Sequence, residues 1–386
     1  MFDKFFSLLS YDIGIDLGTT STLVWVRGKG IVVREPSVVA IHKKTKKVIA
    51  IGGEAKKMVG KTPAAISTVR PLKGGVIADF DATSNMISYY IQSIHEVGNV
   101  FPVSWSKPKV VIGIPSVVTE VQRRAVWEAA LNAGAREAFL IEEPMAAAIG
   151  EGVSVFAPTG SMIVDIGGGT SEIAIISLGG IVISKSLPLA GDEMDRAIMH
   201  YIRLRHGLLL GERTAEELKI KIGSAAEQKS KLKNEPIRQA QGENEKLKNK
   251  DEKEILNSQP STLNSQKDKA AIVRGRDIET GLPKSLRITE VEVREALAPV
   301  ISEIIEGISE VLEEAPPELT SDILEHGILL TGGGSLLPGI DKVIVERTHI
   351  PVIASEDPLT SVVRGAGKVL EDTALLERVK VIGGLK

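Results

Sequence analysis

The sequence predicts an α/β protein built from two related lobes, and three observations support this prediction. The chain has 386 residues, more than one hydrophobic core usually serves. Val- and Ile-rich strands alternate with amphipathic helices along most of its length. A strand that ends near an Asp, a Gly-rich turn and a second strand occur at 15–21 and again at 164–171, which indicates an internal duplication.

The composition excludes several classes of protein. A net charge of −3 leaves no basic footprint for nucleic acid, so we expect no nucleic-acid partner. The absence of Cys excludes disulfides and thiolate metal sites, and it fits a reducing cytoplasm. No stretch reaches the roughly 18 apolar residues of a membrane span, and the short apolar start has no secretory cleavage site.

The first half of the chain reads mainly as short strands, with three helices. A helix is expected at 81–96. A capping box, Thr119 to Gln122, opens a second helix that ends at Gly134. Pro144 suits the first turn of another helix, because its missing N–H has no intrahelical partner to lose. Strands are expected at 12–16, 22–27, 30–33, 37–42, 47–51, 109–114 and 138–141.

The second half repeats this pattern around one unusual segment. Residues 228–269 contain no aromatic residue and many Lys, Glu, Gln and Asn, which predicts a disordered insertion. Around it we expect strands at 161–165, 172–177, 272–274, 286–288 and 328–330, and helices at 192–206, 213–223, 290–313 and 338–346.

Gly-rich turns follow three of the apolar strands and predict a phosphate site. Glycine lets backbone N–H groups approach an anion closely, and neighbouring Thr hydroxyls add donors. Asp16 and Asp165 precede the first two turns and would face each other across a cleft. Two carboxylates beside phosphate favour magnesium, held through water. Neither a Walker A nor a Rossmann pattern is present. The turn residues are Gly18, Thr19 and Thr20; Gly167, Gly168, Gly169 and Thr170; and Gly332, Gly333 and Gly334.

Two acidic residues begin the helix at Pro144. A carboxylate at a helix N-terminus interacts favourably with the helix dipole, and we keep this structural interpretation for Glu142. For Glu143 we favour a functional one, in which its side chain orients water toward a terminal phosphate.

The N-terminus carries an apolar helical face. Phe2, Phe5, Phe6 and Leu9 have the i, i+3, i+4, i+7 spacing of one side of a helix. Such a helix either docks on the protein's own core or lies in a bilayer surface, where many copies on one polymer would bind strongly. Phe101 and Trp105 form a second apolar patch, which is either another membrane contact or a buried loop.

Longer motifs carry a resemblance to a known family. The chain resembles the actin, sugar kinase and heat-shock chaperone ATPase superfamily at IDLGTTST (15–22), EEPMAAAIG (142–150), VDIGGGTSE (164–172) and LLTGGGSLLPG (329–339). It more closely resembles the MreB family of bacterial actin homologues at REPSVVAI (34–41), RPLKGGVIADF (70–80), GAREAFLIEEPMAAAIG (134–150), PPELTSDI (316–323) and EDPLTSVVRGAGK (356–368).

The resemblance implies an actin-like fold of four subdomains, in which each lobe has an RNase H-like core and the lobes close on ATP and magnesium. It places the first lobe at 11–150 plus about 347–386, with a small subdomain at about 34–67. The second lobe would span 151–346, with a small subdomain at about 191–285 that holds the insertion.

The resemblance also implies roles for individual residues. Glu143 and Thr170 correspond to a water-positioning pair, and Asp16 and Asp165 are the other catalytic candidates. The first phosphate turn is Thr19, Thr20 and Ser21, the second is Gly167, Gly168 and Gly169, the nucleoside segment is Glu216, Glu217, Leu218 and Lys219, and the adenosine turn is Gly333, Gly334, Ser335 and Leu336. Departures at Thr20-Ser21 and at Ala190 are mild.

Three functions compete. The first is an ATP-dependent filament protein at the inner face of the cell membrane; the family implies self-assembly, cell-wall elongation partners and rod-shape maintenance. The second is a small-molecule kinase, although no extra catalytic Asp or substrate module is evident. The third is a chaperone ATPase, although no substrate-binding domain follows the last nucleotide motif.

Overall fold

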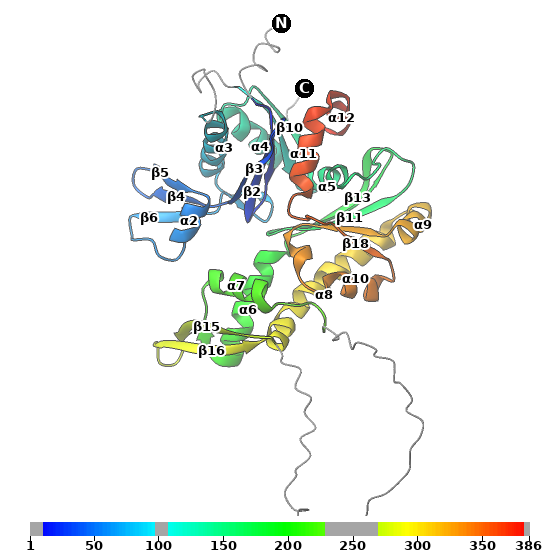
Figure 1. The fold of residues 1–386 in the computed structure, drawn as a ribbon. Helices are drawn as coiled ribbons and strands as arrows, with labels where there is room; N and C mark the ends of the chain where they lie inside the picture. Colours follow the sequence, from blue (N-terminus) through cyan, green and yellow to red (C-terminus); the bar gives the residue numbers. More distant parts are fainter. Residues whose placement is uncertain (1–10, 97–106, 228–268, 382–386) are drawn as a thin grey trace, which may run out of the picture.

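The computed structural model describes residues 11–96, 107–227 and 269–381, and these form two five-stranded mixed sheets (Figure 1). The first sheet has the order β10-β9-β1-β2-β3 and the second has the order β13-β12-β11-β17-β18. The first contains β1 (Ile13–Leu17), β2 (Ser21–Val26), β3 (Gly30–Pro36), β9 (Lys109–Ile114) and β10 (Glu137–Glu142). The second contains β11 (Ser161–Ile166), β12 (Ser171–Ser177), β13 (Gly180–Leu187), β17 (Ile328–Thr331) and β18 (Val352–Ala354).

The two sheets share one topology. In the first, β1 pairs antiparallel with β2 and parallel with β9. In the second, β11 pairs antiparallel with β12 and parallel with β17. The outer strands β3 and β13 are antiparallel to their neighbours, and β10 and β18 are parallel to theirs. The duplication that the sequence predicts is therefore repeated strand by strand in each sheet.

Two helices join the lobes. They are α5 (Glu143–Glu151) and α11 (Ser361–Glu371), which pack closely against each other. One apolar cluster contains Met145 of α5 and Val369 of α11 together with Val111 of the first sheet and Ile163 of the second. The central core is thus shared between the lobes.

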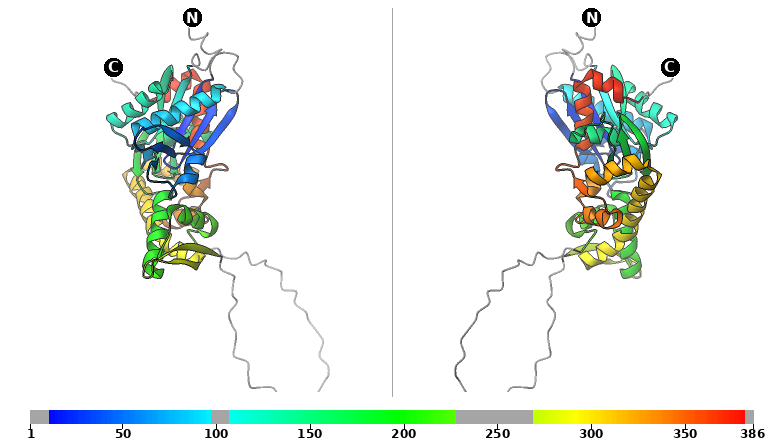
Figure 2. Two further views of the ribbon diagram at one scale, coloured as in Figure 1. Left: turned by 90° about the vertical axis from the view of Figure 1, so that its left-hand side faces the viewer. Right: turned by 90° about the vertical axis from the view of Figure 1, so that its right-hand side faces the viewer.

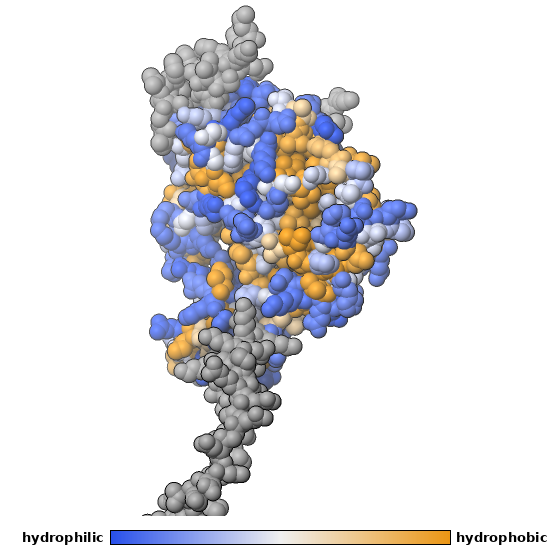
Figure 3. Space-filling view, turned by 45° about the vertical axis from the view of Figure 1, so that its right-hand side comes forward, coloured by the Kyte–Doolittle hydropathy of each residue, from blue (hydrophilic) through white to orange (hydrophobic). Residues whose placement is uncertain are grey.

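The remaining helices lie on the outer faces. α3 (Phe80–Glu96) and α4 (Glu120–Asn132) belong to the first lobe, and α12 (Thr373–Val379) follows α11. α8 (Glu290–Glu314), α9 (Pro317–His326) and α10 (Ile340–Thr348) belong to the second. Side views show the first-lobe elements above those of the second lobe (Figure 2). On the face in Figure 3 a band of apolar residues runs down the middle between hydrophilic edges.

Each lobe also carries a small three-stranded sheet, and both small sheets lie to the left of the main sheets in Figure 1. In the first lobe it consists of β4 (Val39–His42), β5 (Val48–Ile51) and β6 (Ile66–Val69), with α2 (Gly53–Met58). In the second lobe it consists of β14 (Leu208–Leu209), β15 (Ala270–Asp277) and β16 (Pro283–Thr289), with α6 (Gly191–His206) and α7 (Glu212–Ile222). A hairpin of β7 (Leu72–Lys73) and β8 (Val76–Ile77) reaches the cleft from the first lobe.

Several sequence expectations need correction. The second lobe extends beyond residue 346, because β18 pairs with β17 in the second sheet. The helix expected at 338–346 begins at Ile340, after a 3-10 turn, η2 (Gly333–Leu336). The strands expected at 272–274 and 286–288 are longer, because they pair over seven positions.

Some sequence expectations lie outside the described residues. These are the apolar segment 1–10, the patch that contains Phe101 and Trp105, and all but the last residue of the insertion 228–269. Among the residues that the structure does describe, no helix is long and apolar enough to cross a membrane.

Candidate functional site

The Gly-rich turns meet at the floor of the cleft between the lobes. The first turn joins β1 to β2, the second joins β11 to β12, and the third follows β17. They line a narrow chamber of about 60 Å³ together with Asp16, Glu143 and Asp165. A second chamber of about 330 Å³ shares Thr20 and the second and third turns and extends to α6 and α7. A small polar chamber therefore adjoins a larger one.

The first two turns lie so close together that two positions of the second turn, Gly168 and Gly169, require glycine. A Cβ at Gly168 would lie 2.0 Å from Thr20 Oγ1, and one at Gly169 would lie 2.4 Å from Thr19 Oγ1. No side chain larger than hydrogen fits at either position without displacing a Thr. The glycines thus let the backbones of both lobes face the same small chamber.

Hydrogen bonds from neighbouring elements hold the first turn. The backbone N–H of Gly75, in the β7–β8 hairpin, donates to Thr19 Oγ1 at 3.0 Å. Thr20 Oγ1 donates to Asp192 Oδ1 at 3.3 Å, and the N–H of Asp192 donates to the carbonyl oxygen of Gly168 at 2.7 Å. Asp192, at the start of α6, therefore links the turns of the two lobes.

Four carboxyl groups lie in or beside the small chamber, of which those of Asp165 and Glu172 belong to buried residues and those of Asp16 and Glu143 to half-buried ones. Burial, and secondly the charge of Asp165, raise the pKa of Asp16 to about 8. Burial raises the pKa of Asp165 to about 7, although the Thr331 hydroxyl opposes this. Burial and the nearby charges of Glu172, Asp16 and Asp165 raise the pKa of Glu143 well above its usual range. Burial also raises the pKa of Glu172.

This concentration of like charge suits a bound cation. Buried carboxylates repel one another, and a hard cation with oxygen ligands relieves that repulsion. Within the described ranges, no group of three or more His, Asp or Glu side chains is close enough to hold a metal ion directly. The carboxylates of Asp16 and Asp165 are oxygen ligands of the kind that a hard divalent cation such as magnesium prefers, so the residues present fit such an ion.

The larger chamber is polar on the side of α6 and α7. Lys219 forms a 2.9 Å ion pair with Asp195 and donates to the Gly191 carbonyl oxygen at 2.7 Å. Burial raises the pKa of Asp195 to about 6, against the effect of Lys219. Glu216 pairs with Lys56 of α2 at 2.8 Å, and this contact joins the small sheets across the cleft.

Most residues predicted from the sequence line these chambers, and four do not. Ser21 begins β2, outside both chambers. Glu217 pairs with Arg213 on the surface of α7, whereas Leu218 is buried in the second-lobe core. The Ser335 hydroxyl donates to the Gly332 carbonyl oxygen, which stabilises the third turn. The residues that line a chamber as predicted are Asp16, Gly18, Thr19, Thr20, Glu143, Asp165, Gly167, Gly168, Gly169, Thr170, Glu216, Lys219, Gly332, Gly333, Gly334 and Leu336.

Other lining residues were missed. Gly75, Asp192, Asp195, Pro358 and Leu359 all line a chamber. A signal existed for four of them, because Gly75 lies in RPLKGGVIADF, Asp192 follows Ala190-Gly191, and Pro358 and Leu359 lie in EDPLTSVVRGAGK. That these five residues line the cleft can be seen only in the folded structure, where the two lobes lie together.

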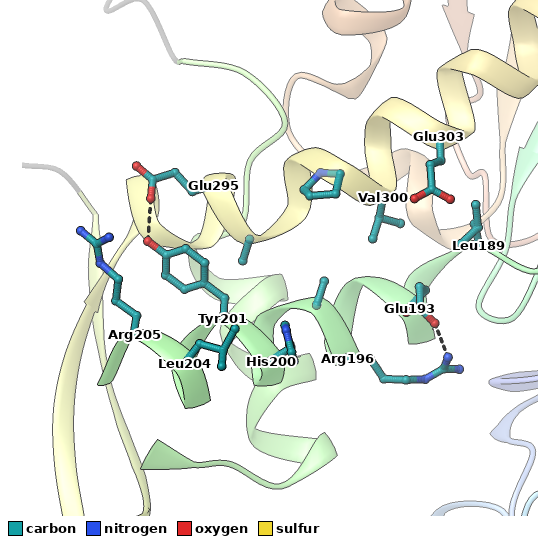
Figure 4. Close-up of a pocket in the computed structure, with 13 residues that line it drawn as sticks. Leu189, Glu193, Arg196, His200, Tyr201, Leu204, Arg205, Glu295, Val300 and Glu303 are labelled. Carbon is teal, nitrogen blue, oxygen red and sulfur yellow. Dashed lines mark hydrogen bonds and ion pairs between the residues drawn. The ribbon is translucent and has the colours of Figure 1, made fainter. Parts of the chain in front are cut away.

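A larger hollow of about 860 Å³ lies elsewhere, between α6 and α8. Figure 4 shows Tyr201 of α6 bonded to Glu295 of α8 at one end, and Glu193 beside Arg196 at the other. None of the predicted site residues lines it. The convergence of Gly-rich turns and buried acids makes the cleft the candidate site.

Comparison with known proteins identifies the family. The model of the MreB/Mbl protein family matches residues 10–257 and 246–378. The chain belongs to the MreB/Mbl family. Two relatives from this family, both named cell shape-determining proteins, are similar to this chain over nearly its whole length. MreB of Escherichia coli K12 is 44% identical over 375 residues, covering 96% of each chain. Mbl of Bacillus subtilis is 40% identical over 374 residues, covering 97% of this chain and all of the relative.

Solved MreB structures confirm the fold. The crystal structure of MreB5 of Spiroplasma citri bound to ADP has a TM-score of 0.80 at 34% identity, covering 95% of this chain and 98% of that one. A MamK double helical filament has a TM-score of 0.70 at 22% identity, covering 94% and 99%, and supports the fold alone. The predicted actin-like α/β fold is thus confirmed.

Proposed function

We propose that the chain is an ATP-binding and ATP-hydrolysing actin-like cytoskeletal protein that polymerises, maintains rod cell shape and guides cell-wall synthesis. The observation that carries this proposal is the cleft, where three Gly-rich turns and the acids Asp16, Glu143 and Asp165 line one small chamber. Two findings support this proposal. MreB5 of Spiroplasma citri was crystallised with ADP and with AMPPNP. The relatives to which this chain is similar are named cell shape-determining proteins.

The two chambers suit the two parts of a nucleotide. Backbone N–H groups of the first and second turns, with Thr19 and Thr20, would bind the phosphates in the small chamber. Glu216, Lys219, Gly334 and Leu336 line the larger chamber, which would hold the nucleoside. Asp16 and Asp165 would hold magnesium through water. When bound, the ion would neutralise charge on the phosphates.

For hydrolysis, Glu143 is the residue suited to orient the attacking water. Its side chain lines the small chamber together with Thr170. A bound cation would offset the charges of Asp16 and Asp165 that help to raise its pKa, and would leave the carboxylate ionised and able to accept a proton. Thr170 lines the same chamber, and its hydroxyl oxygen would offer a second acceptor for the same water. We propose a slow reaction that is coupled to polymerisation rather than to a metabolic product.

The proposed partners follow from the same assignment. Copies of the chain would assemble into filaments, and cell-wall elongation proteins would act with them. Residues 1–10, with Phe101 and Trp105, would attach the filament to the inner face of the cell membrane by inserting apolar side chains. Repetition along a polymer would turn a weak single contact into firm attachment. A small-molecule kinase is not favoured, because the similar relatives are cell shape-determining proteins.

Calorimetric titration of ATP with magnesium tests the nucleotide site. We expect one site per chain, with binding weakened when magnesium is omitted. Gly168→Val should abolish binding, because its side chain would displace Thr20, whereas Gly211→Val, at a position with no atom within 4 Å of an added Cβ, should bind as the unaltered protein does. Equal affinity in the two variants would place the nucleotide elsewhere.

A further inference from the structure

Glu172 is a departure from the pattern of the duplicated unit. In the first unit Asp16 pairs across the β1–β2 ladder with Leu23. In the second unit Asp165 pairs across the β11–β12 ladder with Glu172. A strand at this register therefore needs no acid, since leucine occupies the equivalent position in the sister sheet.

The acid at this position is costly for stability. Glu172 is 1% exposed, and Asp165, which lies directly opposite it on the same face, is 7% exposed. Like charges directly opposite one another on a sheet destabilise it, and burial increases the effect. The charge of Glu172 also contributes to the raised pKa values of Asp165 and Glu143. A residue that carries this cost without serving the strand points to a role in the site.

Its hydrogen bonds cross between the lobes. Glu172 Oε2 accepts from the backbone N–H of Ser116 at 3.1 Å and from its hydroxyl at 2.8 Å. Ser116 belongs to the first lobe, in the segment between β9 and α4. On the second-lobe side, Glu172 accepts from the hydroxyls of Ser186 and Thr170. One carboxylate thus joins a first-lobe loop to the residue that ends the second Gly-rich turn.

The surroundings leave little freedom at this junction. Thr170 is 8% exposed, and a Cβ at Gly75 would lie 2.7 Å from Pro115 and 3.1 Å from the Thr170 methyl group. The β7–β8 hairpin, the Pro115–Ser116 loop and Thr170 therefore pack together at the small chamber. Any separation of the lobes there would break the bonds from Ser116 to Glu172.

We propose that Glu172 is a positioning residue for ATP hydrolysis, which fixes Thr170, a neighbour of Glu143 in the lining of the small chamber, toward the terminal phosphate when the lobes close on each other. The proposal rests on the function proposed above. Glu172 lines neither chamber itself and acts through its neighbours. Closure of the cleft would thereby be linked to the arrangement of the attacking water.

The test compares Glu172→Gln with the unaltered full chain. The variant keeps the size of the side chain but loses the charge that holds the Ser116 and Thr170 donors. We expect ATP hydrolysis to fall about tenfold or more, with ATP affinity within about twofold of the unaltered protein. Glu310→Gln is the matched control, because Glu310 pairs with Lys185 between α8 and β13, away from the cleft, and its hydrolysis rate should be unchanged.

A double-mutant cycle separates positioning from a general structural effect. If Glu172, through Thr170, helps to position the same attacking water as Glu143, Glu172→Gln should cause little further loss of hydrolysis rate in a Glu143→Ala background. Ser116→Ala, which removes only the cross-lobe hydroxyl, should slow hydrolysis in the same direction and without a change in affinity. This second variant keeps the question answerable if Glu172→Gln folds poorly.

Two outcomes would overturn the inference while leaving the proposed function intact. One is normal hydrolysis by Glu172→Gln together with normal hydrolysis by Ser116→Ala. The other is a double variant, Glu172→Gln with Glu143→Ala, whose rate of ATP hydrolysis falls by the product of the two single-variant losses. Failure of the unaltered chain to bind or hydrolyse ATP would instead overturn the proposed function, and this role with it.

Discussion

At the scale of single residues, the cleft is organised by acids whose charges conflict until a ligand balances them. Asp16 and Asp165 lie on corresponding strands of the two sheets, and Glu143 begins the helix that joins the lobes. Burial and mutual repulsion raise all three pKa values. The charges of these acids therefore oppose one another, and a cation bound among them should stabilise the protein.

Glu143→Ala should separate binding from hydrolysis. The variant loses a proton acceptor for the attacking water but no phosphate donor, so we expect hydrolysis to slow about 100-fold while ATP affinity changes little. Steady-state ATPase assays and calorimetry measure the two effects. Glu142→Ala is the control, because Glu142 lines neither chamber. A collapse of affinity in Glu143→Ala would show that Glu143 has been assigned the wrong role.

Asp16→Asn should stabilise the nucleotide-free protein in a pH-dependent way. Because the folded pKa of about 8 is above the ordinary value of 3.8, folding binds a proton, and the stability of the unaltered protein falls as pH rises through this window. The asparagine does not titrate. The gain in melting temperature should therefore be larger at pH 8 than at pH 6. A gain that is equal at both pH values, or larger at pH 6, would contradict the burial of this charge.

At the scale of elements, the contact between α5 and α11 depends on small residues. A Cβ at Gly365 would lie 1.8 Å from the carbonyl oxygen of Ala146, and one at Gly150 would lie 2.0 Å from that of Ser361. Lys368 of α11 donates to the carbonyl oxygens of Ile149 and Gly150, near the end of α5. The backbones of the joining helices are thus in direct contact, so any added side-chain atom must separate them.

Gly365→Ala should therefore destabilise the protein, although alanine is the better helix former. We expect a loss of about 1–3 kcal/mol in the free energy of unfolding, the range typical of overpacking. Urea denaturation measures it. Gly180→Ala is the control, since nothing lies within 4 Å of a Cβ added there. If the two variants have the same free energy of unfolding, α5 and α11 do not approach each other as closely as described.

The same elements show what the sequence can and cannot predict. The strands beside the Gly-rich turns are predictable, because β-branched runs and glycine punctuation agree locally. The helix α11 was not predicted, because Gly365 and Gly367 disfavour a helix. The apolar residues Val362, Ala366 and Val369 nevertheless have helical spacing, and packing against α5 and Trp25 stabilises the helix. Likewise the phosphate turns were found from their glycines, whereas the contacts that Asp192 and Glu172 make between the lobes depend on how the lobes pack and could not be predicted from the sequence.

At the scale of the whole molecule, two similar sheets share one central core and face each other across one cleft. The cavity between them is small where the turns touch and larger toward α7. Contacts such as Lys56–Glu216 and Arg70–Asp192 join the lobes at its mouth. A ligand bound between the lobes would contact both of them and could change their relative position. Control of polymerisation by a nucleotide requires such a change.

Removal of residues 1–10 should separate membrane binding from assembly. The apolar face of Phe2, Phe5, Phe6 and Leu9 is the proposed anchor, so the shortened protein should no longer sediment with liposomes but should still polymerise with ATP. Ser7→Ala lies off that face and should behave as the unaltered protein. Continued liposome binding by the shortened protein would move the anchor to another surface.

The central claim is that nucleotide in the cleft drives self-assembly. High-speed sedimentation of the full chain over a series of protein concentrations, with ATP and magnesium or with no nucleotide, tests it most directly. We predict polymer above a critical concentration that is markedly lower with ATP and magnesium. Protein that stays in the supernatant at every concentration, or that pellets equally without nucleotide, would contradict the account.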